Sequence, residues 1–390
     1  MSSTHVTNKS LVDPLYAFTP YRICPLGAHV DHQKGPITGF AIDKGIHINY
    51  QPTEDGLIEV SSVQFDGVAV WSVFDVPESA VGDWADHLRG ATVALARRFD
   101  LFRGVCAVVN GELPIGGLSS SAAVIISFLS ILARVNSIKL SQEMMIELAL
   151  EAENKYVGVS CGRLDQSCEV YCKKDNLLHM DLLNDSISLI SEPDNMPPYK
   201  IAIFFSGLER SLAQSKYNAR VDEAKEAACI LLELSGIAHG DRSTTYLSDV
   251  PREVFEHYKD QLPDDLRKRA THFFTECERV EQGVKAWQDG DIREFGRLIF
   301  ESGKSSIEQW ETGSPELIKL YDIMTKTDGI YGGRFSGAGF KGCCMAIIDP
   351  SKQDSIIETV RTEYISAYPH LSDRFSAHIC NTADGVKIEE

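Results

Sequence analysis

At Pro114-Ile-Gly-Gly-Leu-Ser-Ser-Ser-Ala-Ala-Val124 the chain changes from strand-like to helical character. The residues before this stretch, 105–110, are mostly β-branched or small and predict a buried strand. The residues after it, 120–134, form a mostly apolar run without Pro or Gly and predict a helix. Gly116 and Gly117 let the backbone turn tightly between the two and approach a ligand closely.

The three serines that follow the glycines lie where a helix would begin. Free N–H groups and the positive end of the helix dipole make such a position a binding site for an anion such as phosphate. Serine is also an ordinary N-cap residue, so the segment alone leaves plain capping open. The stretch lacks the lysine of a Walker A loop, which excludes that class. The candidate phosphate-binding residues are Gly116, Gly117, Leu118, Ser119, Ser120 and Ser121.

The bulk composition is that of an ordinary globular protein. The chain has 390 residues, 43% hydrophobic and 24% charged, with a formal net charge of −18. This negative charge argues against a nucleic-acid or anionic-membrane partner, and no obligate protein partner is implied. The first ten residues lack the apolar stretch of a signal peptide, and no run is long enough to cross a bilayer. We therefore expect a cytoplasmic protein.

Ten cysteines fit a reducing compartment. Cys161, Cys168 and Cys172 lack the spacing of a zinc site, and Cys343 and Cys344 lie in a strand-like apolar run. We interpret the cysteines as buried free thiols.

Strands and helices alternate along the whole chain, which predicts an α+β protein. The predicted strands are residues 39–50, 56–63, 68–73, 105–110, 177–182, 200–205 and 343–348. The predicted helices are residues 84–98, 120–134, 141–156, 218–234, 266–289, 292–303, 315–327 and 351–368. A Pro-rich polar stretch at 192–198 predicts a boundary between two domains, 1–195 and 196–390.

Three further segments are rich in chemical groups. Residues 20–35 hold Arg22, His29, Asp31, His32 and Lys34. The two histidines and the aspartate suggest a metal site, but no further ligand stands nearby at a familiar spacing, so hydrogen bonding to a polyhydroxylated ligand is favoured.

The other two segments are loops in the sequence pattern. In residues 158–166, Asp165 lies among small and apolar neighbours. It can be interpreted as a turn residue or as a catalytic carboxylate. Residues 332–342, Gly-Gly-Arg-Phe-Ser-Gly-Ala-Gly-Phe-Lys-Gly, are a second glycine-rich segment, as a hairpin or as part of a site. Together with the first, it suggests a ligand held between two domains.

All four segments, in this order, resemble the GHMP kinases, the family of galactokinase, homoserine kinase, mevalonate kinase and phosphomevalonate kinase. Residues 21–32 resemble the galactokinase signature G-R-x-N-L-I-G-E-H-x-D-Y, and residues 114–122 the family's phosphate loop P-x-G-G-L-S-S-S-A. Residues 162–166 are similar to G-I-M-D-Q, and residues 332–342 to the terminal glycine-rich motif.

The resemblance implies a two-domain fold with the active site between the domains. The first domain would be like ribosomal protein S5 domain 2, and the second a ferredoxin-like α/β domain. The cofactors implied are ATP and Mg²⁺, with a phosphoryl group transferred to the C1 hydroxyl of a sugar. Asp165 would be the general base, with Arg22 beside it to stabilise developing charge and keep it ionised.

The remaining roles are also implied by the resemblance. The phosphate loop would hold the β- and γ-phosphates of ATP, and Ser121 and Glu153 would hold the Mg²⁺ that bridges them. His29, Asp31 and Tyr217 would bind sugar hydroxyls.

The chain departs from the galactokinase pattern where charge matters. Ala28 stands where galactokinases have a Glu that contacts the C6 hydroxyl, so this change removes a negative charge. Arg163 and Lys341 replace uncharged residues and add positive charge, and either is a candidate to pair with a C6 carboxylate. A sugar acid needs this combination, because two carboxylates repel in a partly desolvated pocket. Drift at positions that do not touch the substrate is the alternative.

The activity expected from the resemblance is therefore phosphorylation of D-galacturonate at C1, giving galacturonate 1-phosphate and ADP. The alternatives are a sugar 1-kinase acting on galactose or glucuronate, and a non-catalytic sugar sensor. Such sensors tend to lose part of the serine-rich loop, which this chain retains.

Overall fold

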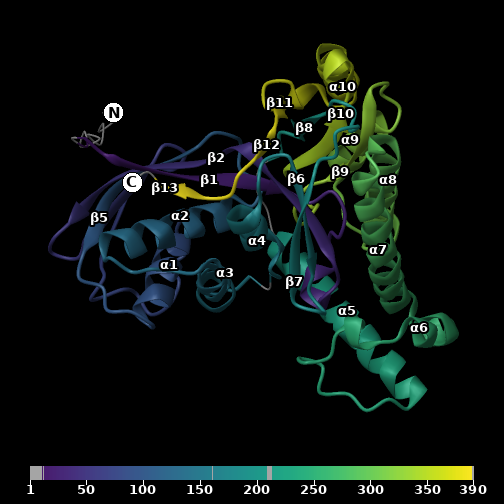
Figure 1. The fold of residues 1–390 in the computed structure, drawn as a ribbon, viewed down its shortest axis with the longest axis horizontal. Coiled ribbons are helices and arrows are strands. Elements are labelled where there is room, and N and C mark those ends of the chain that lie inside the picture. The colour runs from purple at the N-terminus through teal and green to yellow at the C-terminus, as the bar shows by residue number, and fades with distance from the viewer. Residues whose placement is uncertain (1–10, 12, 160, 209–212, 389–390) are drawn as a thin grey trace.

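The computed structural model describes residues 11, 13–159, 161–208 and 213–388. The first ten residues, on which the signal-peptide interpretation rests, lie outside this part. The described chain builds two sheets, each covered by helices, with a pair of long helices beside both (Figure 1).

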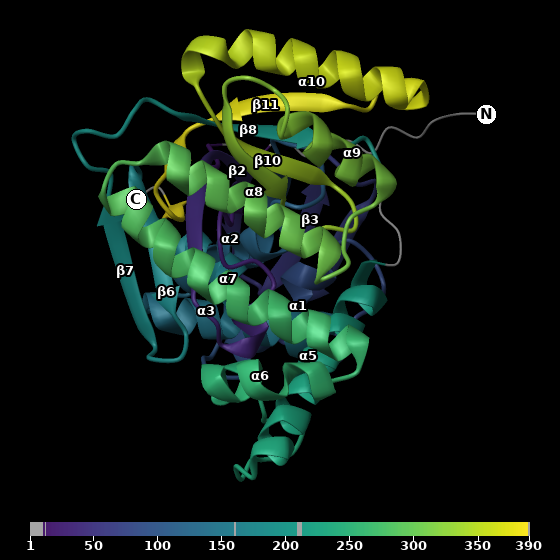
Figure 2. The same ribbon diagram turned by 90° about the vertical axis from the view of Figure 1, so that its right-hand side faces the viewer.

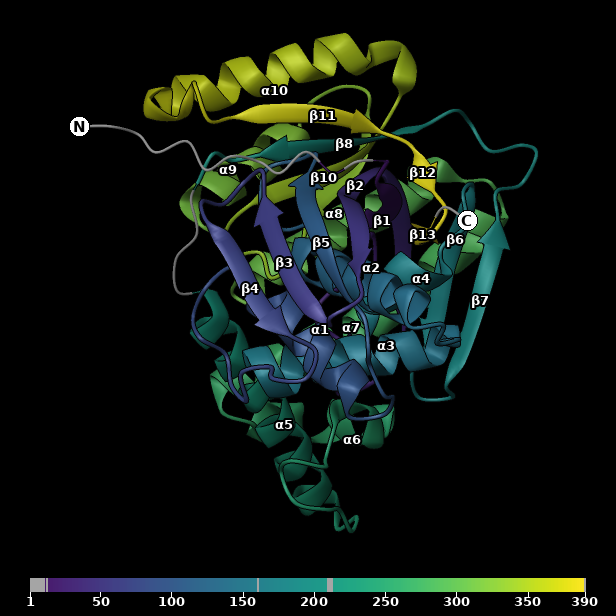
Figure 3. The ribbon, with the colours of Figure 1, turned by 90° about the vertical axis from the view of Figure 1, so that its left-hand side faces the viewer.

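The first sheet carries most of the N-terminal half. Its order is β13-β1-β2-β5-β3-β4, with β12 and β6 also paired to β2, and β7 to β6; β3 and β5 are parallel. The strands are β1 (Leu15–Ile23), β2 (Ile37–Thr53), β3 (Leu57–Ser62), β4 (Val68–Ser72), β5 (Gly104–Gly111), β6 (Asn176–Asp181), β7 (Ser186–Ser191), β12 (Thr382–Ala383) and β13 (Lys387–Ile388). The helices α1 (Asp86–Ala96), α2 (Ser120–Val135), α3 (Gln142–Glu151) and α4 (Leu164–Tyr171) cover one face (Figure 3).

The second sheet has the order β11-β8-β10-β9. Its strands are β8 (Lys200–Phe205), β9 (Ile330–Phe335), β10 (Cys343–Ile348) and β11 (Ser376–Cys380). Every residue of β10 is buried, because alternate side chains enter two different cores. One core lies against α9 (Pro315–Met324) and α10 (Gln353–Ala367), and the other includes α8 (Ile292–Glu308). This burial on both faces explains the unbroken apolar run in the sequence.

A third core ties the helices α5 (Ala213–Ser235), α6 (Arg252–Tyr258) and α7 (Asp264–Gln288) to the loop after β1. The pair α7 and α8 packs side by side across the front in Figure 2. These helices bring the second half of the chain against residues 24–35, one of the chemically rich segments.

The predicted strands and helices are all present, with shifted ends. The structure adds the strands β1, β7, β9, β11, β12 and β13 and the helices α4 and α6, which the sequence pattern did not predict. Ser141 caps the start of the predicted helix over 141–156, where its hydroxyl accepts from Met144 N at 3.1 Å. This helix is an α-helix only as far as Glu151, and residues Ala152–Val157 continue it as a π-helical turn. Such turns are frequent at functional sites, and this one carries Glu153.

The predicted domain boundary falls between β7 and β8, where the chain leaves the first sheet. The end of the chain nevertheless returns there, because Thr382 pairs with Ile42 in β2 and Ile388 with Ala17 in β1. The two sheets therefore do not correspond to two uninterrupted halves of the sequence. The division at 195/196 stays a prediction.

All ten cysteines are free thiols, as predicted. Six are buried, but Cys106, Cys161, Cys229 and Cys277 are half-exposed, so the prediction of burial is wrong for these four. In the part of the chain that the structure describes, no helix is long and apolar enough to cross a membrane.

Candidate active site

The loop before α2 adopts a conformation that depends on its two glycines. Gly116 and Gly117 have φ values of 142° and 85°, which residues other than glycine rarely adopt. Ser119 follows at φ 59° without a glycine's freedom, and its hydroxyl makes no cap hydrogen bond to α2. Instead it donates to Asp165 Oδ2. The structure therefore does not support plain capping as the role of this serine.

Arg22 and Asp165 form the central ion pair. Arg22 Nε donates to Asp165 Oδ1 at 2.6 Å, and Arg22 Nη1 donates to the carbonyl oxygen of Gly117 at 3.0 Å. Arg22 is 3% exposed; burial opposes its charge, but Asp165 raises its pKa above the usual value. Asp165 lies in the first turn of α4, so the prediction of a loop position is wrong. The pair links β1, the glycine-rich loop and α4.

Glu153 is hydrogen-bonded to the serine-rich loop and lines the same cavity as Arg22 and Asp165. Its Oε1 accepts from Ser121 Oγ at 2.8 Å and its Oε2 from Gln166 Nε2 at 2.7 Å. Burial, and next the negative charge of Asp165, raise the pKa of Glu153 to about 7. Within the described residues, no group of three or more His, Cys, Asp or Glu side chains is arranged to hold a metal ion. A cation here would therefore need oxygen ligands from a bound molecule in addition to Ser121 and Glu153.

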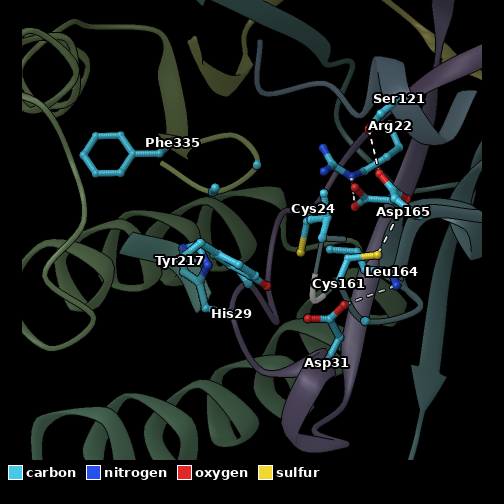
Figure 4. A pocket seen from close by; sticks show the side chains of 16 residues that line it. Arg22, Cys24, His29, Asp31, Ser121, Cys161, Leu164, Asp165, Tyr217 and Phe335 are labelled. Carbon is cyan, nitrogen blue, oxygen red and sulfur yellow. Dashed lines mark hydrogen bonds and ion pairs between the residues drawn. The ribbon is translucent and has the colours of Figure 1, made fainter. Parts of the chain in front are cut away.

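These groups open into the first cavity, of about 240 Å³. Figure 4 shows Arg22 and Asp165 on one side of it and His29 and Tyr217 across from them. Residues of both sheets contribute, so a ligand here would lie between them, as expected. The lining residues are Arg22, Cys24, Ala28, His29, Asp31, Ser121, Glu153, Val159, Cys161, Gly162, Leu164, Asp165, Tyr217, Phe335, Gly337 and Ala338.

Asp31 is fixed against the segment that carries Asp165. Its Oδ2 accepts from Leu164 N at 3.3 Å. Gly162 lies so close that a Cβ built there would be 2.2 Å from the same oxygen. Burial, and next the charge of Asp165, raise the pKa of Asp31 to about 6.

His29 lies across the first cavity from Arg22 and Asp165, and one of its ring nitrogens has no hydrogen-bond partner among the described residues. Its ring stacks on Trp310 at a centroid distance of 5.4 Å and an angle of 5°. His29 is 5% exposed, and its Nε2 is buried without a hydrogen-bond partner in the described structure. Burial, and then the charge of Arg334, hold the pKa of His29 well below its usual value. The neighbouring Ala28 is held by His272, whose Nε2 lies 3.0 Å from the Ala28 carbonyl oxygen.

Three carboxylates line the first cavity: Asp31, Glu153 and Asp165. Figure 4 shows Asp165 beside Arg22, with Asp31 apart from that pair, near the Leu164 backbone.

A second cavity, of about 510 Å³, lies on the other side of the serine-rich loop. It shares Ser121 with the first cavity and is also lined by Ser120. Phe65 and Trp84 stack on its wall with an angle of 1° and a centroid distance of 5.9 Å. The two cavities therefore meet at Ser121 in the first turn of α2, a position whose N–H groups can bind an anion.

Arg163 and Lys341, the two cations that the chain adds to the galactokinase pattern, do not line the first cavity. Arg163 lines a third cavity and pairs with Glu143 at 2.5 Å and Asp185 at 3.4 Å. Lys341 lies in the loop between β9 and β10 and does not line the first cavity. A carboxylate contact by either stays a prediction that this geometry does not favour.

The loop between β9 and β10 touches the serine-rich loop directly. A Cβ on Gly116 would lie 2.9 Å from Gly342 Cα, and one on Gly337 would lie 3.0 Å from Gly117 Cα. The segment 332–342 consists of the end of β9 and the hairpin loop that follows it. It is a hairpin, as one alternative predicted, and it also lines the first cavity.

Sequence reasoning missed several lining residues. Cys24, Cys161 and Phe335 lie within the segments it singled out, so their neighbours were the signal. Trp310 and His272, which hold His29 and Ala28, come from distant helical regions and had no signal of their own.

Comparison with known proteins gives one consistent family. Residues 86–173 match the GHMP kinases N terminal domain, and residues 282–366 match the GHMP kinases C terminal domain. The galacturonokinase of Arabidopsis thaliana is 37% identical over 95% of this chain and 92% of its own length. The galactokinase of Roseiflexus sp. is 30% identical over 94% of this chain and 91% of its own length.

Solved structures agree. The crystal structure of Lactococcus lactis galactokinase with galactose superposes with a TM-score of 0.87 at 25% identity, covering 96% of this chain and 95% of that one. Methanococcus jannaschii mevalonate kinase, at 14% identity and a TM-score of 0.67 over 95% and 98% of the two chains, shares the fold.

Proposed function

The chain belongs to the GHMP kinase family, and from this premise we propose that it transfers the γ-phosphoryl group of ATP to the anomeric C1 hydroxyl of D-galacturonate. The products are galacturonate 1-phosphate and ADP. The galacturonokinase relative supports the substrate, and the galactokinase relatives support the same chemistry on a neutral sugar.

One observation carries the proposal: the Arg22–Asp165 pair stands in the first cavity, which meets the second cavity at Ser121. Two cavities joined at a helix start suit a sugar and a nucleotide whose phosphates lie at the junction. We place the sugar in the first cavity and the base of ATP in the second, against Phe65 and Trp84. No sequence motif marked this base site.

Asp165 would accept the proton of the C1 hydroxyl as general base. Arg22 Nε and the Ser119 hydroxyl each occupy one of its oxygens, and each oxygen has a second lone-pair site left for the sugar. Arg22 also reaches the phosphate loop through Gly117 O, so it stands where charge develops on the transferring phosphoryl.

The chemistry of Ser121 and Glu153 fits Mg²⁺, which prefers oxygen ligands and is commonly held by one or two side chains plus phosphates. When bound, the ion would neutralise charge on the β- and γ-phosphates. The Ser121–Glu153 hydrogen bond of 2.8 Å already holds the two oxygens together.

We place the C6 carboxylate beside Ala28 and His29, which both line the first cavity. A carboxylate placed near Asp31, Glu153 or Asp165 would be repelled, since like charges in a partly desolvated site interact strongly. His29 Nε2 is buried and unpartnered, and the neutral ring, with its one proton on Nε2, would donate to the carboxylate. His29 thus takes the role that the sequence left between Arg163 and Lys341.

The test is ADP release by the purified protein with ATP and Mg²⁺, offered galacturonate, glucuronate and galactose in parallel. We expect the highest kcat/KM with galacturonate. Galactose as the best substrate would keep the chemistry and refute the carboxylate assignment. No turnover with any of the three would refute the proposed activity and favour the sugar sensor.

Activity should fall as the pH drops from neutrality. Burial and then Asp165 raise the pKa of Glu153 to about 7 and that of Asp31 to about 6. Glu153 must be ionised to hold a cation, and Asp31 must be ionised to accept hydrogen bonds from sugar hydroxyls. We therefore expect kcat/KM to rise as the pH passes through these two pKa values, and to be low below both of them. Because Mg²⁺ competes with the proton on Glu153, more Mg²⁺ should move the acid limb to lower pH. A pH–rate profile that stays flat below neutrality would contradict the assignment.

Gly162→Ala should weaken sugar binding. The new Cβ would stand 2.2 Å from Asp31 Oδ2 and must displace this carboxylate. We expect a rise in KM for the sugar on the order of 10²-fold, as for a misplaced binding group, with a smaller change in KM for ATP. Gly67→Ala is the control, because its Cβ meets nothing within 4 Å and adds only backbone strain at φ 91°. An unchanged sugar KM in the Gly162 variant would remove Asp31 from the substrate contacts.

A further inference from the structure

The third cavity, of about 490 Å³, lies beside the first and shares part of its wall. The shared residues are Asp31, Cys161 and Gly162. The lining residues of the third cavity are Asp31, His32, Lys34, Asn154, Cys161, Gly162, Arg163, Leu182, Asp185, Val221, Lys225 and Tyr246. Three of them are cationic and two are carboxylates, in a chain whose net charge is −18.

Two of the cations converge on one ring. Lys34 Nζ lies 4.4 Å and Lys225 Nζ 5.3 Å from the centroid of Tyr246. Lys225 also donates to the carbonyl oxygen of Ser243 at 3.2 Å. Throughout the described residues, neither ammonium forms an ion pair with a carboxylate. Because like charges repel, this arrangement favours an anion between them.

Two buried donors of the same cavity also lack partners. Arg163 uses its terminal N–H groups on Glu143 and Asp185, but its Nε is buried with no hydrogen-bond partner in the described structure. The same holds for His32 Nε2. Buried polar atoms are nearly always hydrogen-bonded in native proteins, so two such atoms in one cavity point to a missing ligand.

The wall between the cavities is closed at Gly162. A Cβ at this glycine would lie 2.2 Å from Asp31 Oδ2 and 2.9 Å from His32 N, which leaves no passage for a sugar ring at that point. A ligand of the third cavity is therefore a molecule separate from the sugar that is phosphorylated.

We propose that the third cavity is a second anion site, which binds the carboxylate or phosphate of a small acid through Lys34, Lys225, Arg163 and His32. The source of the ligand rests on the proposed function: the small acids at hand in the reaction are galacturonate and galacturonate 1-phosphate. The shared wall makes the site regulatory, because a bound anion places negative charge next to Asp31. It should disfavour the ionised Asp31 and so weaken sugar binding in the first cavity.

The experiment measures binding and inhibition with three probes: inorganic phosphate, galacturonate 1-phosphate and galacturonate at high concentration. Calorimetric titration of phosphate into protein saturated with a non-hydrolysable ATP analogue and the neutral sugar galactose reports binding outside the catalytic site. For galacturonate and galacturonate 1-phosphate, which can also enter the first cavity, the binding that the double variant loses reports the third cavity. Initial rates at constant ionic strength report the KM for the sugar. The variant is Lys34→Ala/Lys225→Ala, and Lys304→Ala is the control, since that side chain is 65% exposed and lies on α8.

In the wild-type chain and in the control we expect at least one probe to bind and to raise the sugar KM about fivefold or more, the range of ordinary allosteric coupling. The double variant should lose both effects and keep its uninhibited kcat and KM. Binding of galacturonate 1-phosphate alone would identify product feedback, and galacturonate binding would identify substrate inhibition. Failure of all three probes to bind outside the first cavity, or phosphate binding that survives in the double variant, would overturn the proposal. Phosphate binding does not depend on which sugar is phosphorylated, so this arm separates failure of the anion site from failure of the proposed function.

Discussion

Asp165→Asn should lower kcat on the order of 10²–10⁴-fold, the usual contribution of a general base, while the protein stays folded. The amide keeps the size of the carboxylate but cannot take a proton from the sugar. Its oxygen can still accept from Arg22, and the Ser119 hydroxyl can turn to accept from the new N–H group, so the local hydrogen bonds have replacements. The measurement is ADP release under saturating ATP and sugar.

The matched control for this variant is Asp264→Asn, because that side chain is 60% exposed at the start of α7, far along the chain from the site. Thermal unfolding and sugar binding by calorimetry separate loss of chemistry from loss of structure. If the Asp165 variant turns over normally, Asp165 is not the base.

Ala28→Glu should reverse the preference between charged and neutral sugars. Ala28 is 7% exposed and lines the first cavity. Two carboxylates about 4 Å apart repel by about 1 kcal/mol in water and about 4 kcal/mol at an effective dielectric of 20. We therefore expect kcat/KM for galacturonate to fall about 10-fold to 10³-fold, with a smaller change for galactose.

Ala28→Gln is the control, because glutamine fills the same volume without a charge. It should lower activity on both sugars alike, through crowding. Equal losses for the two sugars in the glutamate variant would mean that Ala28 does not face the C6 group, and the charge argument would fail even if galacturonate is the substrate.

Most residues of the candidate site lie in the motif segments that the sequence analysis identified. Arg22, Ser119 and Asp165 are separated by up to 143 residues, yet the structure joins them within hydrogen-bond distance. They were found because each sits in a stretch whose glycines or dense polar groups are unusual for plain structure. The roles of these residues in binding and catalysis stay proposals.

Some elements had no clear local signal. The helix α4 has only eight residues and mixes polar and apolar side chains, so its pattern did not separate it from the loop before it. Strand β9 contains Gly332 and Gly333, and the sequence pattern predicts a loop there because glycine is rare in strands. Here glycine is required by packing: a Cβ at Gly332 would lie 2.1 Å from the carbonyl oxygen of Gly296 in α8.

The sequence by itself determined the α+β class and most of the regular elements, because these depend on local periodicity. The family and the segments that meet at the site followed from the resemblance of four ordered motifs to the GHMP kinases. Only the tertiary structure decided where each side chain points. Arg163 and Asp165 are two residues apart at the start of α4, and about 3.6 residues per turn separates such positions by about 200° around the axis. Asp165 therefore enters the first cavity and Arg163 the third. Likewise, Trp310 and His272 reach His29 and Ala28 through the packing of the second half of the chain against the first, which no local pattern records.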